Sequence, residues 1–269
     1  MLTFNWRVTY RSEGPLDVHG AGLGVVLADR SVEVGGEDLP VIPGSSLRGV
    51  ARTELERLLR SVGRFVCQPP HPDRMCPHVR SGTARPGESG SQGKPVSEAE
   101  KQNFAGLTAI GREQLVFCDA CRIFGSPWLS SAVWFSELVT AEPVKVATRT
   151  SVSVSRWTGS AESERLYSFE FVPAGADRST LLWVGNVEGR LEEPLAGLLL
   201  IALRMVSHLG GQKARGFGRV SLVRIEGHVG PSRPDEPLTE DVSNKLMELG
   251  WARLERASAP DAKGGSAHD

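Results

Sequence analysis

Four cysteines are the side chains in this sequence that are best suited to bind a metal ion. Two form the knuckle "CDAC" and two stand earlier in the chain, so that the set is Cys67, Cys76, Cys118 and Cys121. The knuckle can supply two thiolates to one tetrahedral zinc ion, and the earlier pair would complete the site. His71 and His78 lie near the earlier pair and are alternatives to one cysteine. Because four protein ligands leave no open position, we predict a structural Zn²⁺; buried thiols without metal are the alternative.

The motif "IPGSSLRG" has residue types that could bind an anion. A helix is predicted to start after Ser45 or Ser46, either of which could cap its first turn. The start of a helix presents free amides and a positive dipole end, and the two serines would add hydroxyl donors. Arg48 and Arg52 lie four residues apart near this start and would add positive charge. We interpret the motif as a phosphate-binding site; an ordinary capped helix with solvated arginines is the alternative.

A second candidate for phosphate binding is the loop "GGQKARGFG", residues 210–218. It contains two basic side chains, Lys213 and Arg215, and four glycines, which are Gly210, Gly211, Gly216 and Gly218. Glycines let the backbone approach a phosphate closely. A helix C-cap followed by a strand would account for Gly210 and Gly211 but not for the later pair.

The charge distribution supports an anionic partner although the net charge of the 269 residues is only -1. No Asp or Glu occurs in residues 194–225 or 143–161, and both segments contain Lys and Arg; a third basic segment surrounds Arg48 and Arg52. Three basic segments in a neutral protein are typical of a localised nucleic-acid site. No apolar run is long enough to span a membrane, so a cytoplasmic location is expected, which also argues against disulfides.

The elements that must position these motifs are indicated by hydrophobic periodicity. Residues 2–10 alternate between apolar and polar, which predicts a half-buried strand, and a helix is predicted after Ser46. Residues 144–172 predict a long hairpin. Residues 194–209 predict an apolar helix capped by Gly210 and Gly211, and a strand is predicted within residues 216–227. This order is the βαββαβ pattern of an α+β, ferredoxin-like (RRM-like) fold.

The predicted domain organisation has one main unit and a short C-terminal part. Residues 1–230 form the ferredoxin-like domain, with a zinc-stapled insertion at about residues 64–125, whose Gly/Ser/Pro-rich part at 82–97 is expected to be mobile. Residues 231–269 comprise a helix at about 240–256 and a tail, 258–269, expected to be disordered.

Together these motifs resemble the RAMP superfamily of CRISPR effector proteins. The resemblance rests on "GPLDVHGAGLG", "IPGSSLRG", "CDACRIFG", "SRWTGSAESERLYSFEFVPAG" and "GGQKARGFGRV". It is strongest to the backbone subunits of type III complexes, which hold guide RNA and cut target RNA. It therefore implies that Ser45, Ser46, Arg48 and Arg52, with the Gly-rich loop, bind guide RNA (crRNA).

The resemblance also implies a catalytic acid in the loop ahead of "IPGSS". Asp29 matches that position by its spacing from Pro43, and Asp38 lies too close to the motif. Such a carboxylate would hold Mg²⁺ or Mn²⁺ for endonuclease cleavage of the paired target RNA. A subunit that binds RNA without cutting it is the main alternative. A further alternative is a guide-processing nuclease with His19 as general base.

The hairpin predicted at residues 144–172 resembles the thumb of these subunits, which wedges across the duplex of guide and target. Trp157 or Val154 would be the apolar wedge, and Arg149 and Arg156 would contact the RNA backbone. The partners implied are guide RNA, target RNA, other RAMP backbone subunits, and the small and large subunits of the CRISPR complex. The resemblance implies that these backbone subunits contact one another head to tail, an arrangement that builds an open helical filament. The complex would act in antiviral defence.

Overall fold

The computed structural model describes residues 1–19, 31–36, 39–68, 74–79, 94–95, 115–140, 143–174 and 181–255. The predicted catalytic Asp29, Asp38 and the alternative ligand His71 lie outside the described residues. So do the predicted tail, 258–269, and most of residues 82–97.

An antiparallel sheet forms the centre of the described part of the chain. Its strand order is β12-β11-β1-β10-β7-β2, and β6 also pairs with β10. The strands are β1 Leu2–Ser12, β2 Val41–Ile42, β6 Val133–Phe135, β7 Leu138–Thr140, β10 Leu182–Leu191, β11 Val220–Gly230 and β12 Glu236–Pro237. In chain order the core strands β1, β6 with β7, β10 and β11 lie in the order 4-1-3-2, which confirms the predicted ferredoxin-like topology.

Strand β1 lies between β10 and β11 and shows why one face of the sheet is buried. Phe4, Trp6, Val8 and Tyr10 have at most 1% of their surface exposed, whereas Asn5 and Arg7 between them are exposed. The strand period of two places these sets on opposite faces. Tyr10 donates a hydrogen bond from its hydroxyl to the Leu203 carbonyl oxygen at 2.8 Å, and burial raises its pKa. The apolar face is therefore packed against helices.

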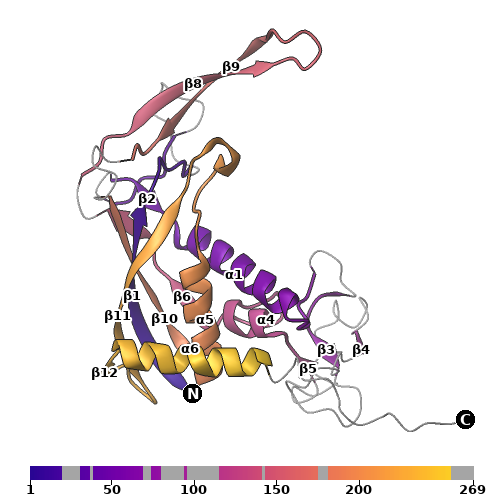
Figure 1. The fold of residues 1–269 in the computed structure, drawn as a ribbon, viewed down its shortest axis with the longest axis vertical. Coiled ribbons are helices and arrows are strands. Elements are labelled where there is room, and N and C mark those ends of the chain that lie inside the picture. Colours follow the sequence, from indigo (N-terminus) through magenta and orange to yellow (C-terminus); the bar gives the residue numbers. More distant parts are fainter. Residues whose placement is uncertain are drawn as a thin grey trace, which may run out of the picture.

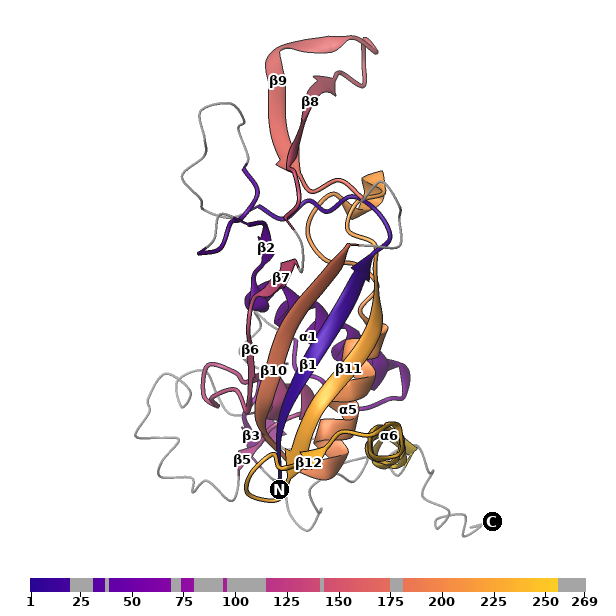
Figure 2. The same ribbon diagram turned by 90° about the vertical axis from the view of Figure 1, so that its left-hand side faces the viewer.

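Two helices cover the apolar face of the sheet, as Figure 2 shows. Helix α1, Gly44–Ser61, buries Leu47, Ala51, Leu55 and Leu59, which are spaced for one helix face. Helix α5, Glu193–Met205, is apolar on nearly all sides because it lies between the sheet and helix α6, Glu240–Glu255. The C-terminal helix predicted at about 240–256 is thus confirmed. Among the described residues, no helix has the length and apolar character needed to cross a membrane.

Two details of the helix ends differ from the sequence-based predictions. The N-cap residue of α1 is Pro43, and neither Ser45 nor Ser46 caps the helix through its side chain. Helix α5 ends at Met205 with Val206 as its C-cap, so Gly210 and Gly211 are not its cap. In both cases tertiary packing fixes the helix end: Gly44 lies against the Phe135 carbonyl, and Val206 is itself buried in the core.

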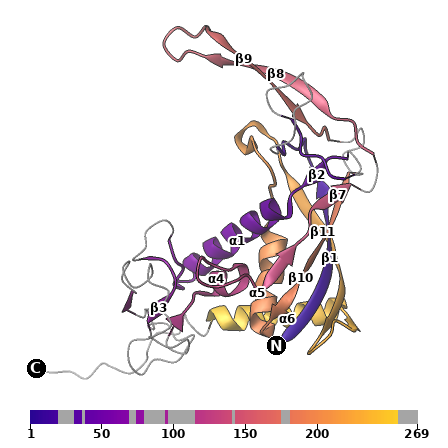
Figure 3. The same cartoon turned by 180° about the vertical axis from the view of Figure 1, so that it is seen from behind.

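The predicted hairpin consists of β8, Ala147–Val154, and β9, Ala161–Phe171, paired in antiparallel register. It projects from one end of the sheet (Figures 1 and 3). The insertion after α1 contains a small sheet of β3 His78–Val79, β4 Lys94–Pro95 and β5 Leu115–Val116, followed by the short helix α4, Asp119–Phe124.

The antiparallel register brings several loops to the hairpin end of the sheet. Ser12 at the end of β1 lies opposite Val220 at the start of β11, and Arg11 lies opposite Leu182 at the start of β10. Segments 13–19 and 206–219 therefore meet at this end, and α1 also begins there (Figure 1). We call it the loop end.

Candidate metal centre and nucleic-acid interface

The four cysteines come together in one buried cluster. Cys67 follows α1, Cys76 precedes β3, Cys118 precedes α4, and Cys121 lies in the first turn of α4. Their sulfur atoms all lie within 4.8 Å of one another. The Sγ atoms of Cys67 and Cys121 are 3.4 Å apart, and those of Cys67 and Cys118 are 3.9 Å apart. These separations are far too long for disulfide bonds, which require about 2.05 Å.

The cluster fits a tetrahedral metal ion. Zn–S bonds of about 2.3 Å give sulfur–sulfur edges of about 3.8 Å in a regular tetrahedron. The four thiols lie close enough to influence one another: a hydrogen bond with Cys118 lowers the pKa of Cys67, and one with the same residue raises the pKa of Cys76. A divalent cation would allow all four to be thiolates together. His78 is not in the cluster, which is therefore a candidate four-cysteine centre within the described residues.

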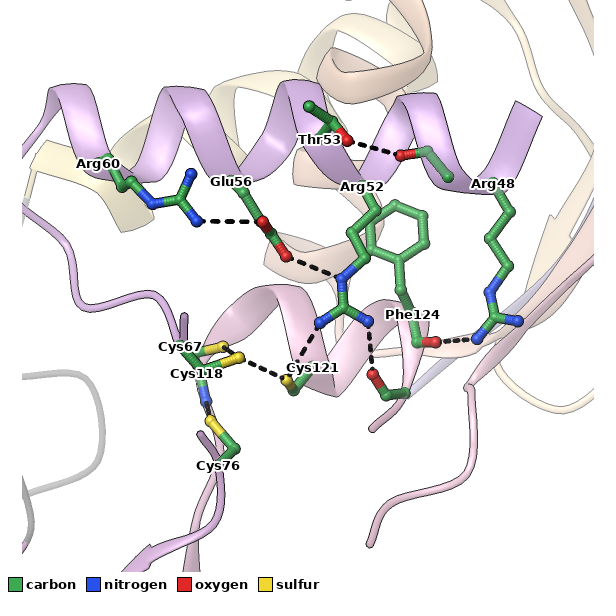
Figure 4. Close-up of polar contacts among 12 residues, drawn as sticks. Arg48, Arg52, Thr53, Glu56, Arg60, Cys67, Cys76, Cys118, Cys121 and Phe124 are labelled. Carbon is green, nitrogen blue, oxygen red and sulfur yellow. Dashed lines mark hydrogen bonds and ion pairs between the residues drawn. The ribbon is translucent and has the colours of Figure 1, made fainter. Parts of the chain in front are cut away.

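Arg48 and Arg52 extend from α1 toward α4 (Figure 4). Arg48 donates a hydrogen bond to the Phe124 carbonyl oxygen, and Arg52 donates one to the Gly125 carbonyl oxygen at 2.9 Å. Arg52 also donates from Nη2 to the Cys121 Sγ at 3.6 Å and from Nε to Glu56 at 2.8 Å. The two guanidinium groups thus satisfy carbonyls at the C-terminal end of α4, where a helix leaves acceptors unpaired.

Asp119, next to Cys118 of the cysteine cluster, joins three arginines in an ion-pair network around its buried carboxylate. It contacts Arg64 at 3.0 Å, Arg253 of α6 at 2.6 Å and Arg122 at 3.8 Å. Burial alone would raise the pKa of Asp119, but the hydrogen bond and charge of Arg253, with the charges of the other two arginines, hold it below its usual value. This network connects α6 to the segment that contains Cys118 and Cys121.

The start of α1 is open to an external anion. It has no acidic residue in its first turn and no side-chain cap, and Ser45 is exposed. A Cβ on Gly49 would meet nothing within 4 Å, so the surface beside this glycine is clear. Gly44, in contrast, is needed for packing, since a side chain there would strike the Phe135 and Ser136 carbonyls. The Ser46 amide already donates to the Pro43 carbonyl at 2.9 Å, so among the first-turn amides those of Gly44 and Ser45 can meet a phosphate.

The Gly-rich loop is hydrogen-bonded through its backbone to segment 13–19. The Gly211 amide donates to the Asp17 carbonyl at 2.7 Å, and the Gly218 amide donates to the Pro15 carbonyl at 2.8 Å. A side chain at Gly210 would strike the Asp17 carbonyl. Between these anchors a short 3₁₀ turn, Lys213–Arg215, has three exposed side chains. Close packing thus accounts for Gly210 and Gly218, and the loop holds the basic turn in solvent.

His19 and Asp17 form a pair at the foot of the Gly-rich loop. The His19 Nδ1 lies 2.6 Å from the Asp17 Oδ1, and Asp17 is 1% exposed. The other ring nitrogen of His19, Nε2, is buried and makes no hydrogen bond among the described residues. Segments 17–19 and 31–33 also run side by side, since His19 pairs with Val32. The described residues on either side of Asp29, 17–19 and 31–33, therefore lie together at the loop end.

The hairpin exposes the side chains predicted to contact RNA. Trp157, at its tip, is 98% exposed, and Val154 beside it is 58% exposed. Arg149 and Arg156 are exposed as well. Arg149 pairs across the hairpin with Phe169, near the root, so its charge lies closer to the loop end than the tip does.

The loop end thus unites three of the predicted groups, namely the start of α1, the Gly-rich loop and the hairpin root. The cysteine centre lies toward the C-terminal half of α1 (Figure 4) and contacts that helix through Arg52. Sequence reasoning missed Asp119, Asp17, Phe217 and Tyr167. The alternation of aromatic residues in "YSFEF", residues 167–171, was a detectable signal for Tyr167; no local signal marked Asp119 or Asp17.

Comparisons with known proteins agree with this architecture. A search of curated proteins found no match. In fold the chain is similar to one in the cryo-electron microscopy structure of the Type III-B Cmr-beta bound to cognate target RNA, with a TM-score of 0.52 and 13% sequence identity. The match covers 84% of this chain and only 60% of the other. The model of the RAMP superfamily matches residues 18–221, which include the Gly-rich loop, the α1 motif, the cysteines and the hairpin. This chain therefore belongs to the RAMP superfamily.

Proposed function

We propose that this chain is a guide-RNA-binding backbone subunit of a type III CRISPR effector complex. Membership of the RAMP superfamily and the likeness in fold to a chain of a complex solved with target RNA support this function. The observation that carries it is that the Gly-rich loop, with the exposed Lys213, and the hairpin root, with the exposed Arg149, meet at the loop end beside the start of α1. Counterion release from phosphates favours such a surface for RNA.

The described geometry suggests how the RNA is held. The open first turn of α1 and the exposed Lys213 bind phosphates, and Arg149 continues the positive surface onto the hairpin. The outer face of the sheet, in contrast, carries acidic and amide side chains as well as basic ones. Asn5 lies there beside Glu188 and His228, and Arg7 lies beside Asn186 and Glu226. Acidic side chains on this face, Glu188 and Glu226, disfavour a polyanion, although the face also bears the rings of His228 and, on β6 opposite Glu188, of Trp134, which is 58% exposed. We therefore place RNA at the end of the sheet rather than across it.

The metal that fits the cysteine centre is Zn²⁺ in a structural role. Four buried thiolates suit a closed zinc site, which connects the insertion to α1 and α4. No position remains for a substrate, so the centre stabilises the fold and takes no part in catalysis.

Cleavage of the target RNA is assigned to Asp29, on the basis of its sequence position alone. A carboxylate at this site would bind Mg²⁺ or Mn²⁺, which would supply charge stabilisation at the scissile phosphate. The flanking segments 17–19 and 31–33 are at the loop end, next to the RNA-binding surface. A subunit that binds RNA without cutting it is the second candidate, and removal of the Asp29 carboxylate distinguishes the two.

A guide-processing role for His19 has less support. A general base needs a ring nitrogen within reach of the RNA, but the Nδ1 atom faces Asp17 and the Nε2 atom is buried. The pair is better explained as support for the Gly-rich loop, to which Asp17 is hydrogen-bonded.

RNA binding is tested with the double variant Lys213→Ala/Arg149→Ala. We expect weaker binding of single-stranded RNA and a salt slope reduced by about 0.7 for each phosphate that the variant no longer neutralises. The matched control is Arg190→Ala/Lys245→Ala, which removes the same charge from positions away from the loop end. Equal RNA affinity and salt slope in the two double variants would show that the loop end is not the binding surface.

A further inference from the structure

Phe217 is buried at the end of the Gly-rich loop by the two glycines that flank it. Gly216 and Gly218 have φ values of +84° and +83°, a conformation that residues with side chains rarely adopt. A Cβ on Gly216 would meet nothing within 4 Å, so only its backbone conformation requires glycine. These two turns direct the Phe217 ring inward, where it is 4% exposed, while Lys213 and Arg215 stay in solvent.

The buried ring packs on the root of the hairpin. Its centroid lies 5.9 Å from that of Phe169 and 5.5 Å from that of Phe171, both in edge-to-face geometry. Phe169 also contacts Tyr167 at 6.3 Å and the His19 ring at 6.3 Å. Aromatic pairs in this geometry are attractive beyond the apolar area that they bury. Phe217 is therefore the side chain by which the loop joins the aromatic cluster of β9.

A second contact fixes the loop to the same strand. Arg215 donates a hydrogen bond from Nη1 to the Tyr167 hydroxyl oxygen at 3.0 Å. Residues 167, 169 and 171 alternate along β9 and so share one face, opposite Ser151, Arg149 and Ala147 of β8. The Gly-rich loop thus covers this face of the hairpin near its root, and Arg149 lies on the same face.

The hairpin depends on these contacts for its orientation. Within the described residues β8 and β9 pair only with each other, and an isolated two-stranded hairpin is marginally stable in water. Besides the aromatic cluster, the root is held by the pairing of Leu16 with Val172 and by a hydrogen bond from the Val32 amide to Glu170. Of these contacts at the hairpin root, the aromatic cluster is the one that includes a side chain of the Gly-rich loop.

We propose that Phe217 is a positioning residue that makes the Gly-rich loop and the β8–β9 hairpin one RNA-binding unit, so that RNA bound at Lys213 also fixes the hairpin. This inference rests on the proposed RNA-binding function. Phe217 itself need not contact RNA, because its ring is buried.

The test measures hydrogen exchange of the full-length chain with and without a single-stranded RNA oligonucleotide of mixed sequence. In the wild type, RNA is expected to slow exchange in both residues 210–218 and β9. In Phe217→Ala, RNA should still slow exchange in the loop, but the effect in β9 should be clearly smaller than in the wild type. Phe217→Leu, which keeps an apolar side chain, should restore part of the effect.

Tyr167→Phe keeps the rings and removes the hydroxyl that accepts a hydrogen bond from Arg215, so it provides a mild variant that does not depend on the folding of Phe217→Ala. It should weaken the effect of RNA on β9 and leave the loop effect unchanged. If β9 responds to RNA equally in the wild type, Phe217→Leu and Tyr167→Phe, the coupling does not exist. If the wild-type loop does not respond to RNA at all, the proposed function itself is wrong.

Discussion

Arg52 donates a hydrogen bond from Nη2 to the Sγ of Cys121 across 3.6 Å, and so connects the helix of the "IPGSSLRG" motif to the cysteine centre. A positive group beside a thiolate offsets the negative charge that four cysteines place around a divalent ion. The residue that sequence reasoning assigned to RNA is therefore placed to support a metal ion at the cysteine centre.

We expect Arg52→Met to weaken zinc binding by about 10- to 100-fold, the usual effect of removing a hydrogen-bonding partner of a metal ligand. Competition with a chromogenic chelator measures this affinity. Arg57→Met is the matched control, because Arg57 is on the same helix, is 68% exposed and pairs only with Glu54 among the described residues. Equal zinc affinity in the two variants would remove Arg52 from the metal centre.

The second prediction concerns the ligands. Elemental analysis of the purified chain should find one zinc per molecule, and Cys118→Ser should lack it, because a hydroxyl is a poor substitute for a thiolate. A chelator should lower the melting temperature of the wild type and leave that of Cys118→Ser nearly unchanged. If the wild-type chain melted at the same temperature with and without metal, the four-cysteine centre would be contradicted.

Asp119→Ala is predicted to destabilise the fold by about 3–5 kcal/mol, because it removes the carboxylate that compensates the partly buried charges of Arg64 and Arg253. Chemical denaturation measures the free energy of unfolding. Asp241→Ala, at an exposed position in the first turn of α6, serves as the control and should change it little. Zinc content measured in parallel separates disruption of the network from release of the metal. A change equal to that of the control would show that α6 is held by its apolar contacts alone.

Asp29→Asn is predicted to abolish cleavage of target RNA by the assembled complex in Mg²⁺ or Mn²⁺ while RNA binding is retained, since an amide is a much weaker ligand for these ions than a carboxylate. Asp38→Asn should cleave normally. Product formation from labelled target RNA measures both. Full activity of Asp29→Asn would favour the candidate function in which this subunit binds without cutting.

Local pattern alone predicted much of the fold. The alternation in residues 2–10 predicted β1, and the helix predicted after the "IPGSS" motif is α1. These predictions succeed because burial on one face depends on a period that neighbouring residues carry themselves. The helix ends were harder to predict, since Gly44, next to the N-cap Pro43, lies against the Phe135 carbonyl and the C-cap Val206 is buried in the core.

The candidate sites divide in the same way. The sequence by itself determined the residue types: four cysteines able to bind zinc, a basic Gly-rich loop, and the motifs shared with the RAMP superfamily. Only the tertiary structure decided that Arg48 and Arg52 reach toward α4, that Asp119 meets arginines from three segments, and that Phe217 joins the loop to the hairpin. These contacts join residues far apart in the chain, and their geometry depends on how the helices and strands pack, which no local period records.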